Sequence, residues 1–348
     1  MRILAIQLNQ PGDALLTTPA LRWLMNQGHE VHALLQPLGA QLLQGMPGLA
    51  SVEALPRDSL QLVRDIRRAI GYRRIGFDWT IVFSKCSDRP ALWAVLSGAA
   101  KRSGLRTPRN AHLGRIGFIN DWREHHSLNV HTTRQHLFMA GAPDDAADHL
   151  SLEYHPPEAE RAWARDWMRQ RGLAEGGYLL LHATARWPSK YWPMTNLVEF
   201  VRGAKQLLKM PLLVTAGRDT VEVNFTRELI GQAAADYQEI GTLSVNQLGA
   251  LLQNAAGFVG VDSMPMHLAA ALGKPGIALF GPTNEITWGP WHSRLTVLRR
   301  DCVCLRESSR SCPTGQESRC LAGLSAATVL EKLVEVLNVS SQAKTLSG

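Results

Sequence analysis

The stretch from residue 257 to residue 283 carries the densest set of residue types that bind phosphate groups. An apolar run typical of a buried strand leads into a helix that opens at Met264-Pro265. Proline at the first turn of a helix needs no amide partner, and the free N–H groups there, with the positive end of the helix dipole, bind anions. The stretch therefore predicts a phosphate site without naming the nucleotide. The candidate residues are Asp262, Ser263, Met264, His267 and Thr283, and for His267 a satisfied core histidine is the alternative.

A second group of polar side chains follows the apolar run at residues 178–182. Thr184 can donate a hydrogen bond to a phosphate, and Lys190 offers a mobile cation that suits a diphosphate. A solvated lysine is the alternative for Lys190. Three aromatic residues near it predict an ordered, packed loop instead: Trp187, Tyr191 and Trp192.

Two carboxylates stand near the starts of predicted helices. Glu222 follows the strand predicted at residues 211–215 and could accept hydrogen bonds from ribose hydroxyls, or serve only as helix N-terminal charge. Asp13 follows the first strand and a Pro11-Gly12 turn, where the helix dipole favours its ionised form. Asp13 is a candidate general base, with a helix-capping role as the alternative.

The elements that must position these groups alternate between strand and helix patterns, which is typical of parallel sheets built from right-handed crossovers. Strands are predicted at residues 2–8, 29–35, 78–84, 178–182, 211–215, 257–261 and 277–280. Helices are predicted at residues 15–27, 59–72, 89–96, 129–139, 158–171, 195–208, 221–235, 245–254, 264–272 and 326–337.

The run His155-Pro156-Pro157 marks a domain boundary, because consecutive prolines break both helix and sheet. The 348 residues are enough for two domains. We therefore expect two doubly wound α/β domains, at residues 1–155 and 156–348, with a cleft between them. The final helix could return to the N-terminal domain. Ligands should bind beyond the carboxyl ends of the strands.

The composition favours an anionic partner. Hydrophobic residues make up 45% of the chain and charged residues 19%, as in ordinary globular proteins, and the formal net charge is +7. Two basic clusters in the N-terminal half are candidates for an anion-binding face, with a solvated surface as the alternative. They consist of Arg64, Arg67, Arg68, Arg73 and Arg74, and of Lys101, Arg102, Arg106 and Arg109.

No apolar stretch approaches the roughly 20 residues that span a bilayer. The apolar run at residues 3–6 is too short for the core of a signal peptide. We therefore expect a cytoplasmic protein, with peripheral membrane contact at most.

A metal site is not indicated by the aspartates, since no D-x-D pattern occurs. Four clustered cysteines leave the question open, because they could hold a metal or remain thiols on a covering loop: Cys302, Cys304, Cys312 and Cys320. Cys86 stands alone. Four histidines lack the spacing of a metal-binding helix face and are interpreted as surface or acceptor-side groups: His125, His126, His131 and His136.

Together, the Gly12-Asp13…Thr17-Thr18-Pro19 turn, the Lys190 loop and the Asp262-Ser263…His267…Gly281-Pro282-Thr283 block resemble the bacterial lipopolysaccharide heptosyltransferases, glycosyltransferase family 9. The resemblance spans nearly the whole chain in the same order. Three motifs look most like the member that adds the third, branching heptose: Arg186-Trp187…Lys190…Trp192, the run VDSMPMHLAAALGKP at residues 261–275, and Trp288-Gly-Pro-Trp291.

The resemblance implies a GT-B fold, ADP-heptose as donor, inversion at the anomeric carbon, and no metal or other cofactor. It implies that Asp13 is the general base and that Lys190, Ser263 and Met264 hold the diphosphate with help from Thr184. Asp262 and His267 would orient the heptose and its phosphate, and Glu222 would hold the ribose. The basic clusters would meet a phosphorylated, anionic lipopolysaccharide core as acceptor.

Two other functions remain open, and a third is disfavoured. The clustered cysteines keep a protein acceptor in consideration, because related enzymes that modify autotransporter proteins carry cysteine-bound iron. A sugar-nucleotide epimerase on the same fold would bind a donor but need no acceptor. A nucleic-acid-binding protein is disfavoured, because aromatic residues do not alternate with the basic stretches as stacking requires.

Overall fold

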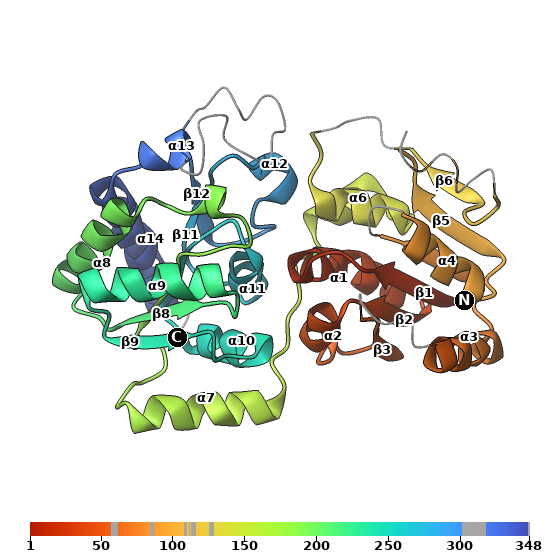
Figure 1. Ribbon diagram of the computed structural model, residues 1–348, viewed down its shortest axis with the longest axis horizontal. Helices are drawn as coiled ribbons and strands as arrows, with labels where there is room; N and C mark the ends of the chain where they lie inside the picture. The colour runs from red at the N-terminus through yellow and green to blue at the C-terminus, as the bar shows by residue number, and fades with distance from the viewer. Residues whose placement is uncertain are drawn as a thin grey trace. The chain divides into compact units, whose positions relative to one another are not determined.

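The chain forms two compact units, Met1–His155 and Pro156–Gly348 (Figure 1). The structure is a computed structural model that describes residues 1–56, 62–83, 87–107, 110, 112, 116–124, 129–300 and 318–346. For residues 62–64 and 339–346 it describes the backbone alone. No described helix is long and apolar enough to cross a bilayer.

The first unit contains a six-stranded parallel sheet in the order β3-β2-β1-β4-β5-β6. Its central strands are apolar runs, and every residue of β1 after Arg2 is buried. In register, Ile3 of β1 lies beside Val31 of β2 and Trp79 of β4. The strands are β1 (Arg2–Gln7), β2 (Glu30–Leu35), β3 (Ser51–Ala54), β4 (Trp79–Val82), β5 (Lys101–Leu105) and β6 (Asp121–Arg123).

Helices cover both faces of this sheet. The strand order reverses at β1 and β4, so right-handed crossovers place α1 and α2 on one face and α3 and α4 on the other. Accordingly, α1 contacts α2 and α6, and α3 contacts α4. The helices are α1 (Pro11–Asn26), α2 (Pro37–Leu43), α3 (Leu62–Ile75), α4 (Asp88–Leu96), α6 (Thr132–Met139) and the 3₁₀ helix η2 (Asp144–Asp148).

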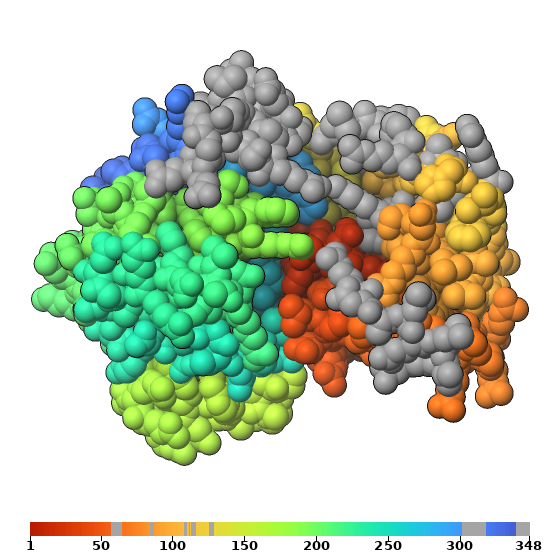
Figure 2. Space-filling model, viewed as in Figure 1, coloured from red at the N-terminus to blue at the C-terminus, as the bar shows by residue number. Residues whose placement is uncertain are grey.

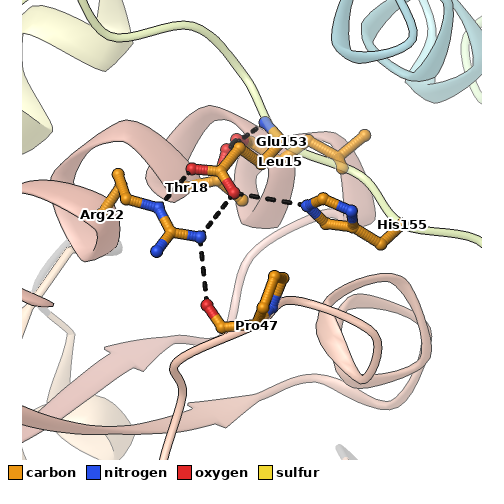
Figure 3. A network of polar contacts seen from close by, with 6 residues as sticks. All are labelled: Leu15, Thr18, Arg22, Pro47, Glu153 and His155. Carbon is orange, nitrogen blue, oxygen red and sulfur yellow. Dashed lines mark hydrogen bonds and ion pairs between the residues drawn. The ribbon is translucent and has the colours of Figure 1, made fainter.

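Pro19 lies in the interior of α1, because this helix begins at Pro11, four residues earlier than predicted. A proline lacks the N–H that would bond the carbonyl four residues before it. The Thr18 hydroxyl compensates by donating to the Leu15 carbonyl oxygen at 2.7 Å. It also accepts a hydrogen bond from the Glu153 backbone N–H at 2.9 Å (Figure 3). The Thr18 hydroxyl thus replaces the missing hydrogen bond of α1 and also attaches the end of the first unit to this helix.

The last residues of the first unit are further held by an ion pair. Arg22 of α1 donates to both carboxylate oxygens of Glu153, each at 2.7 Å, and to the Pro47 carbonyl oxygen at 3.0 Å (Figure 3). His155 contacts the same carboxylate at 3.3 Å. Both charged side chains of the pair are about three-quarters buried, so this contact anchors the segment just before Pro156.

The second unit repeats the architecture, with a parallel sheet in the order β12-β11-β10-β7-β8-β9. Apolar side chains from the sheet and from α8, α9 and α14 form a core around Trp192 and Phe200, both fully buried. The strands are β7 (Leu179–His182), β8 (Leu212–Ala216), β9 (Tyr237–Ile240), β10 (Gly257–Val261), β11 (Gly276–Leu279) and β12 (Leu295–Leu298).

The helices of the second unit again lie on both faces of the sheet (Figure 1). α14 packs against α8 and β11, both in the second unit. The helices are α7 (Glu158–Gln170), η3 (Pro188–Lys190), α8 (Met194–Leu208), α9 (Thr220–Ala233), α10 (Val245–Asn254), α11 (Met264–Ala271), α12 (Glu285–Trp288), α13 (Arg319–Ala322) and α14 (Ala326–Leu346).

The pattern of apolar runs misses five strands and three short α-helices of the structure: β3, β5, β6, β9, β12, α2, α12 and α13. The missed strands lie at or next to the edges of their sheets. β3, β6 and β9 contain no fully buried residue. An edge strand needs no continuous apolar run, because much of it stays in contact with water.

Candidate functional site

The carboxyl ends of four adjacent strands gather the predicted donor-binding residues of the second unit. The sheet reverses its order between β7 and β10, which pair in parallel, and this switch point is where open α/β sheets bind ligands. Thr184 follows β7, Glu222 follows β8, Asp262 follows β10 and Thr283 follows β11. The fold therefore brings to one edge groups separated by up to 99 residues in sequence.

The centre of this edge is a buried carboxylate that binds two donors. The Lys190 ammonium lies 2.6 Å from Asp262 Oδ2 and 3.3 Å from the Asp262 carbonyl oxygen. The Thr283 hydroxyl donates to the same Oδ2 at 2.6 Å. The Lys190 side chain is 17% exposed and that of Asp262 is 6% exposed, so this is a positioned cation and not a solvated lysine.

A second pair lies at the ends of β7 and β8. The Thr184 hydroxyl donates to Glu222 Oε2 at 2.7 Å. A Cβ at Gly217 would lie 2.9 Å from the same oxygen, so the glycine lets the carboxylate lie against the backbone. Asp219 caps α9 by accepting from the Val221 N–H. Glu222 is thus a partly buried hydrogen-bonding group in addition to being helix N-terminal charge.

The start of α11 has the features of an anion site. Ser263 is the N-cap residue, but its hydroxyl donates to the Val261 carbonyl oxygen at 3.2 Å and no side chain caps the helix. Pro265 in the first turn has no N–H to satisfy. The first turn, beginning at Met264, therefore keeps the positive end of its dipole for a ligand.

Two histidines of the second unit are buried. His267, in α11, is 5% exposed, which agrees with either of its predicted roles. His182 ends β7 at 4% exposure, and its Nδ1 lies 2.9 Å from the Thr215 hydroxyl. Burial lowers the pKa of His182 to about 4, so its ring is neutral near pH 7.

The loop before Lys190 differs in part from the prediction. Tyr191 and Trp192 are buried, as expected of a packed loop, and the Trp192 ring N–H donates to the Leu324 carbonyl oxygen. Trp187 instead exposes 46% of its surface, with the Arg186 guanidinium 5.4 Å from its ring centre. The prediction of a packed Trp187 is therefore wrong.

Asp13 of the first unit lies beyond the carboxyl end of β1, at the switch point between β1 and β4. It is the third residue of α1 and completes a capping box, since its Oδ2 accepts from the Gln10 N–H at 3.0 Å. The side chain is partly exposed. The capping role is therefore present, and it holds the carboxylate at the start of α1.

A buried network that the sequence did not indicate lies beneath Asp13. The Thr17 hydroxyl donates to the Asp13 carbonyl oxygen at 2.8 Å and lies 3.3 Å from His136 Nδ1. His136 is 4% exposed, and burial lowers its pKa to about 4. Its interpretation as a surface group is wrong, because α6 packs this ring against α1. The Gln7 side-chain amide, at the end of β1, also donates to the Thr17 hydroxyl at 3.4 Å.

Most of the described basic side chains in the two clusters have structural partners. Arg68 binds Glu53, Arg106 binds Glu124, and Lys101 lies near Asp121 and over the Trp79 ring. The Arg102 guanidinium donates to three backbone carbonyl oxygens. Three arginines of α3 are exposed and form no ion pair with a described residue: Arg67, Arg73 and Arg74. The Arg64 side chain and Arg109 lie outside the described residues.

The cysteine and histidine clusters are described only in part. Cys320 is buried and is not in a disulfide. His131 caps α6 by accepting from the Thr133 N–H. The described residues contain no group of three or more metal-binding side chains. The remaining members lie outside the described residues: Cys86, Cys302, Cys304, Cys312, His125 and His126.

Residues 89–317 match the family described as glycosyltransferase family 9 (heptosyltransferase). The chain belongs to glycosyltransferase family 9. It is 29% identical over 154 residues to lipopolysaccharide heptosyltransferase 3 of Escherichia coli, a match that covers 44% of each chain. It is 25% identical over 350 residues to lipopolysaccharide heptosyltransferase 1 of Pseudomonas aeruginosa, covering 92% of this chain and 90% of the relative. The chain thus matches less than half the length of the former relative and nearly the whole of the latter.

The family resemblance predicted from the motifs is confirmed. The fold is confirmed as well, because the structure of E. coli ADP-heptose lps heptosyltransferase II aligns with a TM-score of 0.76 at 20% identity. That alignment covers 98% of this chain and 100% of the other. At this identity the structural likeness supports the two-domain α/β fold of the GT-B type.

Proposed function

We propose that this family 9 chain transfers heptose from ADP-L-glycero-D-manno-heptose to the phosphorylated inner core of lipopolysaccharide, with inversion and without a metal. The observation that carries the proposal is the Lys190–Asp262–Thr283 cluster beside the uncapped start of α11. A fixed cation next to a helix N-terminus can stabilise the negative charge that develops on a diphosphate leaving group. The second unit would bind the donor and the first unit the acceptor.

Each donor-binding residue has a proposed role. Lys190 and the N–H groups at Ser263 and Met264 would stabilise the charge that develops on departing ADP. The Thr184 hydroxyl would assist at the phosphates, and Glu222 would accept from the ribose hydroxyls. Asp262 and His267 would orient the heptose and its phosphate. Thr283 contributes by holding the Asp262 carboxylate in place.

Asp13 would act as the general base. An oxygen of the acceptor forms a bond to the anomeric carbon as the bond from that carbon to the ADP oxygen breaks. The proton of the acceptor hydroxyl passes to the Asp13 carboxylate. Attack on the face opposite the leaving group inverts the anomeric centre. The partial match to heptosyltransferase 3 of E. coli favours the branching heptose as the sugar that is added.

The donor proposal can be tested by calorimetric titration of the protein with ADP, ADP-heptose and uridine nucleotides, first in EDTA and then with Mg²⁺. Micromolar binding of the adenine nucleotides in EDTA is the expected result. A preference for uridine nucleotides, or a strict requirement for Mg²⁺, would contradict it. Release of free isomerised sugar without acceptor would identify an epimerase instead.

The role of Asp13 is best tested with Asp13→Asn. Asparagine keeps a side-chain oxygen that can accept from the Gln10 N–H, so the capping box should survive. We expect turnover of ADP-heptose with heptose-deficient core to fall by about 10²–10⁴-fold, because general-base catalysis contributes that much. Donor affinity and the unfolding temperature should stay near those of the wild type. Near-native turnover of this variant would exclude Asp13 as the base.

The proposed location follows from the proposed acceptor. We propose a cytoplasmic enzyme that would meet a lipid-borne core at the inner face of the inner membrane. Peripheral membrane contact would serve this purpose.

A further inference from the structure

Helix α3 presents two opposite sides with different chemistry. Its inner side packs on the sheet and on α4, where Tyr72 is buried and its ring lies 5.5 Å from that of Phe77 and 6.1 Å from that of Trp93. Arg68, on the same side, donates to Glu53 Oε2 at 2.8 Å and lies over the Trp93 ring. These contacts fix the rotation of the helix about its axis.

The outer side of α3 exposes large apolar side chains to solvent. Ile66 is 49% exposed and Ile70 is 46% exposed. Residues four apart lie next to each other on a helix, so the two isoleucines form one short apolar strip. Figure 2 shows atoms of this orange part of the chain protruding at the lower right of the molecule. Single exposed apolar residues are common, and the significance of this strip comes from the charges beside it.

Three exposed arginines flank the strip. Arg73 and Arg74 lie seven and eight positions after Ile66, and Arg67 lies seven positions before Arg74, so all three share the outer side of the helix. None of them forms an ion pair with a described residue. The one acidic residue of the helix, Asp65, is turned to the inner side, 3.6 Å from Arg68. The outer side is therefore both apolar and uniformly positive.

We infer that this outer side of α3, the Ile66–Arg74 face, binds the surface of a membrane that contains anionic phospholipids. A helix that lies in the plane of a bilayer inserts apolar side chains between headgroups and pairs flanking arginines with lipid phosphates. The face has both parts of this arrangement. Nucleic acid would use the arginines but not the isoleucines. The inference does not depend on the proposed transfer reaction.

The test is co-sedimentation of the full chain with phosphatidylglycerol–phosphatidylcholine vesicles and with pure phosphatidylcholine vesicles. We expect binding to the anionic vesicles alone, weakened but not abolished by added salt. The triple variant R67Q/R73Q/R74Q should lower the partition coefficient about a hundredfold, since each basic residue near an anionic surface contributes roughly fivefold. The variant I66S/I70S should lower it roughly tenfold or more with all charges intact.

The matched control is R202Q/R227Q/R294Q, which removes the same charge from exposed arginines of the second unit. It should bind vesicles like the wild type. Thermal unfolding checks that every variant is folded, and ADP titration separates a failure here from a failure of the proposed function. The inference is overturned if the control loses binding as strongly as the α3 triple variant, or if I66S/I70S binds like the wild type. It is also overturned if lipid-free core oligosaccharide displaces the protein from vesicles, because the face would then bind the acceptor sugar.

Discussion

At the residue scale, the central feature is a lysine that an aspartate holds in place before any ligand arrives. Lys190 and Asp262 are 72 positions apart, and their contact at 2.6 Å is mostly buried. A buried carboxylate costs free energy unless it is paired, and Lys190 together with Thr283 supplies that pairing. The pair therefore combines a structural role with the positioning of a cation for the proposed diphosphate.

Substitutions at this pair should separate the two roles. Lys190→Ala should lower kcat/KM roughly 10²–10³-fold, because the leaving diphosphate loses a preorganised cation. It should also lower the unfolding temperature, since the Asp262 carboxylate is left buried without its cation. The double variant K190A/D262N should regain stability but not activity. We would measure the unfolding temperature, the ADP affinity and the steady-state rate of both variants. An unchanged ADP affinity in K190A would argue against a role of Lys190 in holding the diphosphate.

At the element scale, α1 shows how a helix accommodates an interior proline. An interior proline costs about 3 kcal/mol in a helix without compensation. The Thr18 hydroxyl supplies the donor that the Leu15 carbonyl oxygen lacks, and it accepts from the Glu153 N–H as well. The same helix carries Asp13 at its start and Arg22 near its end. Its integrity thus matters for the proposed base and for the end of the first unit.

This compensation predicts a non-additive double variant. Thr18→Val should destabilise the protein by about 2–4 kcal/mol, because it removes the partner of a buried carbonyl oxygen and of a partly buried N–H. In T18V/P19A the backbone regains an N–H at position 19 that can donate to the Leu15 carbonyl oxygen, so part of the loss should be recovered. Urea unfolding of both single variants and the double variant gives the coupling free energy. A strictly additive double variant would show that the hydroxyl does not substitute for the missing N–H.

At the scale of the whole molecule, each unit contains a fully buried histidine whose ring is neutral. Burial lowers the pKa of His136 and of His182 from 6.5 to about 4. As the pH falls below 6.5, these two histidines become protonated in the unfolded chain but stay neutral in the folded chain. Stability is lost over the range from pH 6.5 down to about pH 4, below which both states are protonated.

The predicted loss is on the order of 3 kcal/mol for each histidine, since one pKa unit corresponds to about 1.4 kcal/mol. Urea unfolding midpoints measured across this pH range should fall steeply in the wild type. His136→Asn and His182→Asn should each flatten the pH dependence, whatever their effect on stability at pH 7. An unchanged slope in both variants would mean that the histidines do not control acid stability.

The class of fold and most of the candidate donor-binding residues follow from local patterns in the chain. Short apolar runs alternate with helical patterns, and the Pro156-Pro157 pair falls where the structure divides into two units. Polar groups directly after apolar runs, such as Thr184 and Asp262, could be found because a strand end is a local feature of the chain. Apolar runs and helix starts are defined by the types of a few neighbouring residues. They can therefore be recognised without knowing the rest of the molecule.

Which strand ends meet, and which polar groups are buried, depends on the packing of segments that are far apart in the chain. The pairing of β7 with β10 joins segments 78 residues apart and brings Lys190 to Asp262. The burial of His136 against α1, and the exposure of Trp187 in a loop otherwise packed, also depend on neighbours distant in sequence. Such contacts gain their free energy from side chains that the strand order brings together, and that order is not encoded in any one segment.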